Sequence, residues 1–129
     1  LYNDSKILLN QINKLDIKQA CVSASPHELL NKKLQEVQID KLFEYIIGGD
    51  MVKRNKPYPD IYNKAIENLQ TTKNIIIEDS PTGIQSGKNT NNFVLAVNRG
   101  IFSPDQLDQA DLIVDELNLE IINKILETL

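Results

Sequence analysis

Two adjacent carboxylates, Glu78 and Asp79, stand between an apolar run at residues 75–77 and the dipeptide Ser80-Pro81. Acidic groups this close repel each other unless a cation or a hydrogen-bond donor lies near them. One carboxylate can cap the following helix, but Ser80 before Pro81 already suits the N-cap position. Oxygen ligands such as carboxylates are preferred by Mg²⁺. Two interpretations therefore remain open, a helix cap and a Mg²⁺ site, and Ser80 weakens the first.

Lys56 lies in the segment NKPYPD, where Pro57 disfavours a helical backbone and places the lysine in a loop. A loop lysine is most often a solvated charge. If Lys56 instead points towards the acidic pair, its compact ammonium group suits an anion such as a phosphate, or the acids themselves.

Ser23 ends the short apolar run QACV and precedes a predicted helix. Ser25, Pro26 and Glu28 have the spacing of an N-cap, first and third helical residue, which explains Ser25 as a cap. Ser23 has no such structural role. Its hydroxyl and the N–H groups at the start of the helix are suited to bind an anion.

Strands and helices are predicted to alternate along the chain. Continuous apolar runs, rather than strictly alternating ones, favour a parallel sheet covered by helices on both faces, a doubly wound α/β domain. Ligands of such domains bind beyond the carboxyl ends of the strands. Asp50 and Arg99 also follow predicted strands, but nothing in the sequence gives them more than a structural role. The predicted strands are 19–22, 43–49, 74–79, 92–100 and 110–117, and the predicted helices are 1–16, 25–37, 60–69, 81–90 and 119–129.

Composition excludes several classes of protein. The chain has 129 residues and a net charge of −4, which argues against nucleic acid or an anionic membrane as a partner. A single cysteine, Cys21, excludes an internal disulfide framework, and no apolar run approaches the ~20 residues of a membrane span. The N-terminal residues lack the layout of a signal peptide, so a cytoplasmic protein is expected.

A serine after one apolar run, a Lys-Pro loop and an acidic pair after another follow each other in chain order. The segments CVSAS, NKPYPDIY and IIIEDSPTGIQSG resemble the second, third and fourth motifs of the haloacid dehalogenase (HAD) superfamily. The resemblance is strongest to the branch of β-phosphoglucomutase-like enzymes and small-metabolite phosphatases. It covers the chain from Leu1 to about Gly100.

The resemblance implies a Rossmann-like core and Mg²⁺-dependent phosphoryl transfer through an aspartyl-phosphate. It implies that the hydroxyl of Ser23 hydrogen-bonds the phosphoryl oxygens, and that Ala24 and Ser25 offer backbone N–H groups to the substrate. Lys56 would bridge the nucleophile and the phosphoryl group. Stabilisation of charge by fixed groups of this kind accounts for most of the catalysis of phosphoryl transfer.

For the metal, the resemblance implies that Asp79 binds Mg²⁺ directly and that Glu78 does so directly or through water. The first motif of the family, an Asp-x-Asp that carries the nucleophile and the general acid/base, does not occur in these 129 residues. The helical cap that follows that motif is missing too. We therefore expect residues 1–129 to be a partial HAD-like core with motifs two to four, the C-terminal part of a longer protein.

The missing N-terminal segment is expected to supply the nucleophile on a central strand between residues 19–22 and 74–79. Loss of a central strand leaves two unpaired edges, so this chain alone is predicted to be inactive and poorly stable. The leading hypothesis is a phosphatase of a small phosphorylated substrate, such as a sugar phosphate or phosphoglycolate. A β-phosphoglucomutase-like phosphomutase and a non-catalytic binding module on the same fold remain as alternatives.

Overall fold

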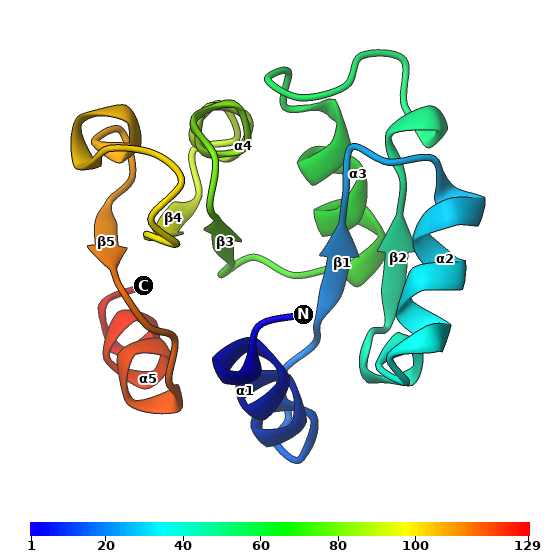
Figure 1. The fold of residues 1–129 in the computed structure, drawn as a ribbon, viewed down its shortest axis with the longest axis horizontal. Coiled ribbons are helices and arrows are strands. Elements are labelled where there is room, and N and C mark those ends of the chain that lie inside the picture. The colour runs from blue at the N-terminus through cyan, green and yellow to red at the C-terminus, as the bar shows by residue number, and fades with distance from the viewer.

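The computed structural model describes residues 1–129, in which helices and parallel strands alternate (Figure 1). All five predicted strands and all five predicted helices are confirmed, with ends that differ by a few residues. Three short 3₁₀ turns complete the chain at Asp40–Leu42, Gly49–Met51 and Pro104–Leu107. The elements are α1 (Asn3–Asn13), β1 (Ala20–Val22), α2 (His27–Glu36), β2 (Tyr45–Ile47), α3 (Asp60–Leu69), β3 (Ile75–Glu78), α4 (Pro81–Lys88), β4 (Phe93–Val97), β5 (Leu112–Val114) and α5 (Leu119–Thr128).

The strands form two parallel sheets. One contains β1 and β2, and the other has the order β3-β4-β5. Strand β4 is central in the larger sheet, which explains why four of its five residues, 94–97, are almost fully buried. Its side chains alternate between two apolar clusters, as the pleat of a strand requires.

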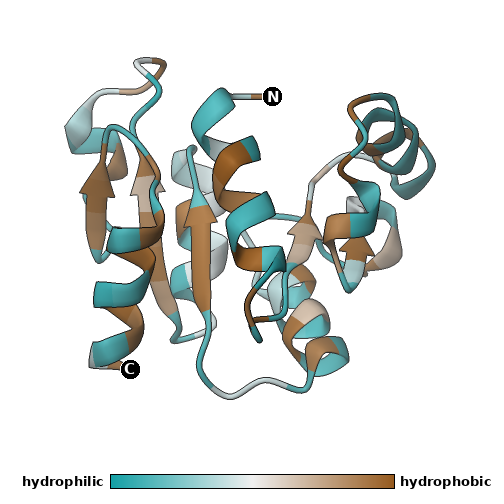
Figure 2. Ribbon diagram, turned by 90° about the horizontal axis from the view of Figure 1, so that it is seen from below, coloured by the Kyte–Doolittle hydropathy of each residue, from teal (hydrophilic) through white to brown (hydrophobic).

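Helices cover both faces of the strands. On one face α3 and α4 pack on Val94 and Ala96, and on the other α1 and α5 pack on Leu95 and Val97. Figure 2 shows strands that are hydrophobic along their length and helices that carry their hydrophobic residues on one side. The doubly wound α/β arrangement is therefore confirmed. No helix has the length and apolar character needed to cross a membrane.

Between β1 and β3 the two sheets are not hydrogen-bonded to each other. A groove of about 650 Å³, lined mainly by apolar side chains, runs between these strands and is flanked by α1 and α3. Ile77, in the middle of β3, is 38% exposed there. The core cluster beneath α3 nevertheless includes residues of both sheets, such as Ile47 of β2 and Ile76 of β3, and so holds the two sheets in one domain.

Helix α1 is fixed to the larger sheet by a partly buried ion pair. The Arg99 guanidinium, just beyond β4, donates two hydrogen bonds of 2.8 and 2.9 Å to the Asp4 carboxylate. That carboxylate also accepts the backbone N–H of Leu117 at 2.8 Å. Arg99 in addition stacks on the Tyr2 ring at 4.1 Å from its centroid. Arg99 thus has a structural role. Through the Asp4 carboxylate, the start of the chain is joined to the segment after β4 and to Leu117.

Acid should weaken this anchor. The hydrogen bonds from Arg99 lower the pKa of Asp4 from 3.8 to about 2. A carboxyl group with a depressed pKa stabilises the fold above its unfolded-state pKa, and this contribution is lost as the pH falls through the folded-state value. Asp4→Asn should therefore lower the free energy of unfolding by about 2 kcal/mol at pH 6, with the difference from wild type closing between pH 4 and 2.

Urea unfolding of the wild type and Asp4→Asn at several pH values measures this difference, and the exposed Asp16→Asn is the matched control. A deficit of Asp4→Asn that stays constant from pH 6 to pH 2 would contradict the assigned role of the charge.

Candidate functional site

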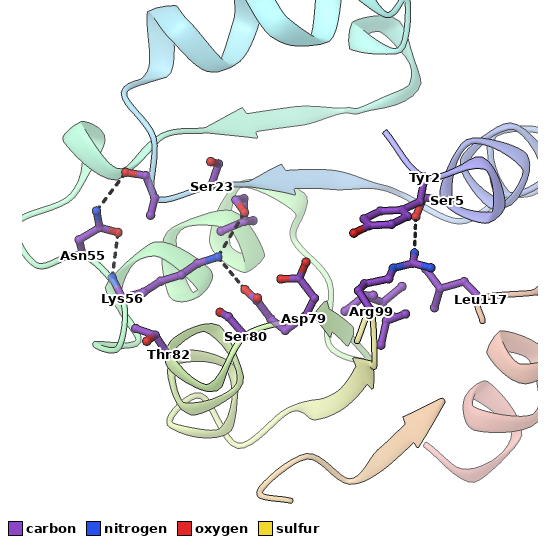
Figure 3. Close-up of a pocket in the computed structure, with 15 residues that line it drawn as sticks. Tyr2, Ser5, Ser23, Asn55, Lys56, Asp79, Ser80, Thr82, Arg99 and Leu117 are labelled. Atoms are coloured by element: carbon purple, nitrogen blue, oxygen red, sulfur yellow. Dashed lines mark hydrogen bonds and ion pairs between the residues drawn. The ribbon is translucent and has the colours of Figure 1, made fainter. Parts of the chain in front are cut away.

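A pocket of about 490 Å³ lies at the carboxyl ends of β1 and β3 (Figure 3). It brings together all but one of the site residues predicted from three separate segments of the sequence, and Ser25 is the predicted residue that does not line it. Ser23 and Ala24 come from the loop after β1, Lys56 from the loop before α3, and Glu78 and Asp79 from the end of β3.

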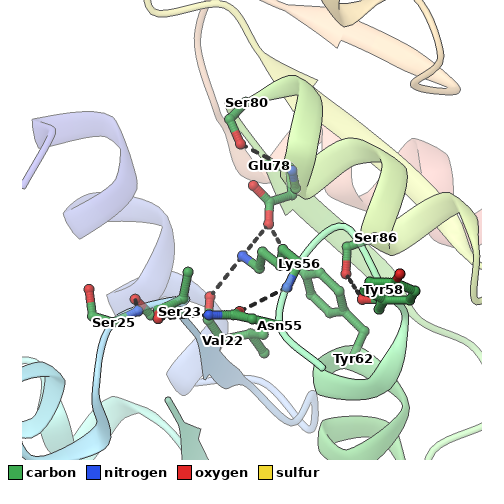
Figure 4. A network of polar contacts seen from close by, with 12 residues as sticks. Val22, Ser23, Ser25, Asn55, Lys56, Tyr58, Tyr62, Glu78, Ser80 and Ser86 are labelled. Carbon is green, nitrogen blue, oxygen red and sulfur yellow. Dashed lines mark hydrogen bonds and ion pairs between the residues drawn. The ribbon is translucent and has the colours of Figure 1, made fainter. Parts of the chain in front are cut away.

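Lys56, Glu78 and Tyr62 form one buried polar network (Figure 4). The Lys56 ammonium lies 2.6 Å from Oε1 of Glu78, and only 12% and 8% of the two side chains are exposed. Tyr62, from the first turn of α3, donates its hydroxyl hydrogen bond to the same carboxylate oxygen. Burial and the negative charge of Glu78 raise the pKa of Tyr62 well above its usual value, so its hydroxyl stays a donor.

The second oxygen of Glu78 lies against the first turn of α4. A Cβ atom added to Gly83 would stand 2.0 Å from Oε2 of Glu78. No side chain larger than hydrogen fits there without moving the carboxylate. Glu78 is therefore held between Lys56, Tyr62 and the backbone of Gly83, which gives its carboxylate a single placement.

Asp79 differs from its neighbour because its side chain is exposed to the pocket. None of the five ion pairs of the chain includes it. Ser80, not Asp79, caps α4, since its hydroxyl oxygen accepts the backbone N–H of Gly83 at 3.1 Å. Ser80 is therefore the helix cap, as its sequence position suggested, and the acidic pair is not. The Asp79 oxygens are left available for a ligand.

The turn after β1 presents hydrogen-bond donors to the pocket. The Ser23 hydroxyl oxygen accepts the N–H of Ser25 at 3.1 Å, so its own O–H can donate to a ligand. The prediction that Ser25 caps the next helix is wrong. That helix begins at His27, and Asp50, from the turn after β2, accepts the His27 N–H at 2.9 Å. An acceptor from 23 positions away thus replaces the local serine.

The loop that carries Lys56 is hydrogen-bonded to side chains at α4 and directly after it. Ser86, which is fully buried, donates its hydroxyl hydrogen bond to the carbonyl oxygen of Tyr58 at 2.7 Å. The side-chain amide of Asn89 reaches the carbonyl of Pro57 at 3.3 Å. These contacts support the loop on the helix that begins directly after the acidic pair, so Lys56 and Glu78 are positioned by the same element.

Two residues of the site were missed in the sequence. Tyr62 looks like one apolar residue of an amphipathic helix, and Asn55 like an ordinary loop residue. The one available signal was that a tyrosine occupies a buried position of α3, because a buried tyrosine hydroxyl usually needs a hydrogen-bond partner. Cys21 has no part in this chemistry, because burial raises the pKa of its thiol to about 11 and keeps it protonated.

No group of three or more His, Cys, Asp or Glu side chains gathers anywhere in the chain as a metal-binding cluster. The exposed Asp79 carboxylate is nevertheless a suitable ligand for Mg²⁺, which keeps several waters and commonly takes only one or two protein carboxylates. Glu78 fits less directly, since its Oε1 already accepts from Lys56 and Tyr62. Residues of this chain therefore fit one part of a Mg²⁺ site.

Comparison with known proteins adds a family to this geometry. The chain is 32% identical over 74 residues to a phosphorylated carbohydrates phosphatase of Thermotoga maritima, a match that covers 56% of this chain and 34% of that protein. It is 32% identical over 96 residues to the pyrophosphatase PpaX of Listeria welshimeri, with 73% of this chain and 44% of the relative covered. The crystal structure of β-phosphoglucomutase from Clostridium difficile superposes with a TM-score of 0.84 at 27% identity, over 97% of this chain and 56% of that one.

The chain thus spans less than half the length of these two curated relatives. The family model of haloacid dehalogenase-like hydrolases matches residues 1–97, which include the turn after β1, the Lys56 loop and the acidic pair. On this match, and with a doubly wound fold shared by its structural relatives, the chain belongs to the haloacid dehalogenase-like hydrolases.

Proposed function

We propose that the full-length protein is a Mg²⁺-dependent phosphatase that acts on a small phosphorylated metabolite through an aspartyl-phosphate. The observation that carries the proposal is the meeting of an ammonium group, a free hydroxyl donor and an available carboxylate in one pocket at the ends of β1 and β3. Relatives of the chain that are named as phosphatases of phosphorylated carbohydrates and of pyrophosphate support the substrate class.

The donors of the turn after β1 would bind the phosphoryl group. Ser23 would donate its hydroxyl to a phosphoryl oxygen, and the backbone N–H of Ala24 would approach it from the same side. The N–H of Ser25 donates to the Ser23 hydroxyl oxygen and would have to leave it to bind the phosphate. Fixed donors of this kind stabilise the charge that the phosphoryl oxygens carry in the transition state.

Lys56 would offset negative charge between the nucleophile and the phosphoryl group. Its ammonium is held by the carbonyl of Val22 at 3.4 Å and by Glu78 at 2.6 Å, so its position is set before a substrate arrives. Glu78 would then act chiefly as the partner that orients Lys56. Its contribution to a metal would be through water, because Oε1 already accepts from Lys56 and Tyr62 and Oε2 packs against Gly83.

Asp79 would be the protein ligand of Mg²⁺ from this chain, with water and the substrate phosphate among the other ligands. Bound there, the cation would neutralise charge on the phosphoryl oxygens. The proposal needs a nucleophilic aspartate that residues 1–129 do not provide in the pocket. Its carboxylate would attack phosphorus as the bond to the ester oxygen breaks, and a general acid from the same segment would protonate that oxygen. Water would then hydrolyse the acyl phosphate, which releases inorganic phosphate and restores the carboxylate.

We infer that this aspartate lies on a strand from a segment that precedes residue 1 and occupies the groove between β1 and β3. In support of this, both strands present unpaired edges to the groove and run in parallel to their sheet partners. A strand inserted there would end beside Ser23 and Asp79, and residues 1–129 would form a partial core domain.

A phosphomutase is the second candidate, and the structural likeness to β-phosphoglucomutase favours it. Both reactions use the same pocket and differ in whether water or a sugar hydroxyl accepts the phosphoryl group. Release of inorganic phosphate from a panel of sugar phosphates, phosphoglycolate and pyrophosphate supports the phosphatase. Isomerised sugar phosphate without free phosphate supports the mutase, and neither product from the full-length protein supports a binding module without catalysis.

Removal of the Asp79 charge tests the metal site. In the full-length protein Asp79→Asn should lower kcat/KM for p-nitrophenyl phosphate by at least about 100-fold and raise the Mg²⁺ concentration for half-maximal activity. Asp115→Asn, an exposed aspartate remote from the pocket, is the matched control. Residues 1–129 alone should be inactive in the same assay, and turnover by them that survives Asp79→Ala would overturn the assignment.

Removal of the Lys56 charge tests the phosphoryl-binding role. Lys56→Met keeps much of the side-chain length and should reduce kcat by about 100-fold or more, because the loss concerns charge that develops in the transition state. Lys53→Met, at an exposed position in the same loop, should leave kcat unchanged. Equal activity of the two variants, measured by steady-state kinetics, would remove Lys56 from the site.

Gly83→Ala tests the packing of Glu78. The added Cβ should displace the Glu78 carboxylate and with it Lys56, so we expect kcat/KM to fall at least about tenfold. Gln85→Ala, an exposed change in the same helix, serves as control. A crystal structure of Gly83→Ala with Glu78 unmoved and full activity retained would show that the contact does not matter.

A further inference from the structure

Asn55 lies at the rim of the pocket and connects two loops that are far apart in sequence. Its side-chain amide donates a hydrogen bond of 3.1 Å to the carbonyl oxygen of Ala24, in the turn after β1. Its side-chain oxygen accepts the backbone N–H of Lys56 at 2.8 Å. Figures 3 and 4 show this side chain between the two loops. Both polar groups of Asn55 are thus used, one on each loop.

The backbone of Gly49 backs this connection. A Cβ atom on Gly49 would stand 2.3 Å from the Asn55 amide nitrogen and 2.4 Å from the Ala24 carbonyl oxygen. The Gly49 N–H also donates to the carbonyl of Ser25 at 2.9 Å. Because Gly49 has no side chain, the turn after β2 can pack directly against Asn55 and the turn after β1.

The connected loops carry two groups that line the same pocket and that are proposed to bind the phosphoryl group, the Ser23 hydroxyl and the Lys56 ammonium. Ser23 is tied to β2 through its own N–H, which donates to Ile47 at 3.1 Å, and Lys56 is tied to β3 through Glu78. These two strands belong to different sheets. Asn55 hydrogen-bonds both the turn that carries Ser23 and the backbone of Lys56. It therefore limits how far apart these two segments can move.

We propose that Asn55 is a positioning residue that sets the spacing between the Ser23 turn and Lys56, and through it the affinity for the phosphoryl group. The inference rests on the proposed phosphatase function. Asn55 itself need not touch the substrate. Asp79 follows β3, and the side-chain hydrogen bonds of Asn55 go to Ala24 and Lys56, so the inference separates the phosphoryl-binding side of the pocket from the metal side.

The test uses the full-length protein and compares Asn55→Ala with Asn68→Ala. Asn68 is an exposed asparagine of α3 whose amide also donates one hydrogen bond to a backbone carbonyl, that of Lys64, at 2.9 Å. For Asn55→Ala we expect kcat/KM for p-nitrophenyl phosphate to fall about tenfold, and the inhibition constant of inorganic phosphate to rise about fivefold, from the loss of two hydrogen bonds. Asn68→Ala should match the wild type in both.

Two further readouts separate positioning from a general loss of structure. In Asn55→Ala the Mg²⁺ concentration for half-maximal activity should stay unchanged, and the melting temperature should shift by no more than about 3 °C. Asn55→Asp keeps an acceptor for the Lys56 N–H but sets a carboxylate against the Ala24 carbonyl, so its loss of phosphate affinity should be at least as large as that of Asn55→Ala.

Several outcomes overturn the inference. Wild-type values of kcat/KM and of phosphate inhibition in Asn55→Ala would do so, as would a steep fall of its melting temperature or a parallel loss of Mg²⁺ affinity, which indicate a merely structural role. A wild type that releases no phosphate and isomerises no sugar phosphate contradicts the proposed function itself. An active wild type with an unaltered Asn55→Ala contradicts only the positioning role.

Discussion

The ion pair of Lys56 and Glu78 is the interaction on which the geometry of the pocket depends. Lys56 also reaches the carbonyl of Val22, so one ammonium group contacts β1 of the smaller sheet and β3 of the larger one, between which no backbone hydrogen bond exists. Both charges are nearly buried, and loss of either would leave the other uncompensated in an environment of low polarity. The pair is therefore tightly constrained by the fold, and Tyr62 completes the hydrogen bonding of the shared carboxylate.

The neighbouring features follow from the need to hold this pair in place. Gly83 leaves space for the Glu78 carboxylate, and Ser86 fixes the Lys56 loop on the same helix, α4. Asp79, one residue beyond the end of β3, lines the same pocket as Glu78 but is exposed there and has no ion-pair partner. Two adjacent acids thus have different environments. One is neutralised within the protein, and the other is available to a cation.

The sequence predicted most of the fold, because apolar runs bounded by Pro, Gly and Ser are local signals that the tertiary structure did not override. Ser80 is an example, since its cap contact reaches only three residues ahead. The contacts that the sequence could not predict are those between residues distant in the chain. Tyr62 meets Glu78 over 16 positions, Asn55 meets Ala24 over 31, and Asp50 took the cap position expected for Ser25. The motif resemblance drew attention to Ser23, Lys56, Glu78 and Asp79, but their hydrogen-bond partners required the structure.

The anchor between Asp4 and Arg99 has a consequence for the kinetics of folding. It joins residues 95 positions apart, and the bond from Leu117 to Asp4 spans 113, so each closes a loop that contains most of the chain. Closing such a loop costs conformational entropy before the contact stabilises the fold. These bonds are therefore expected to form after the rate-limiting step of folding. Their strength would govern how slowly the domain opens rather than how quickly it assembles.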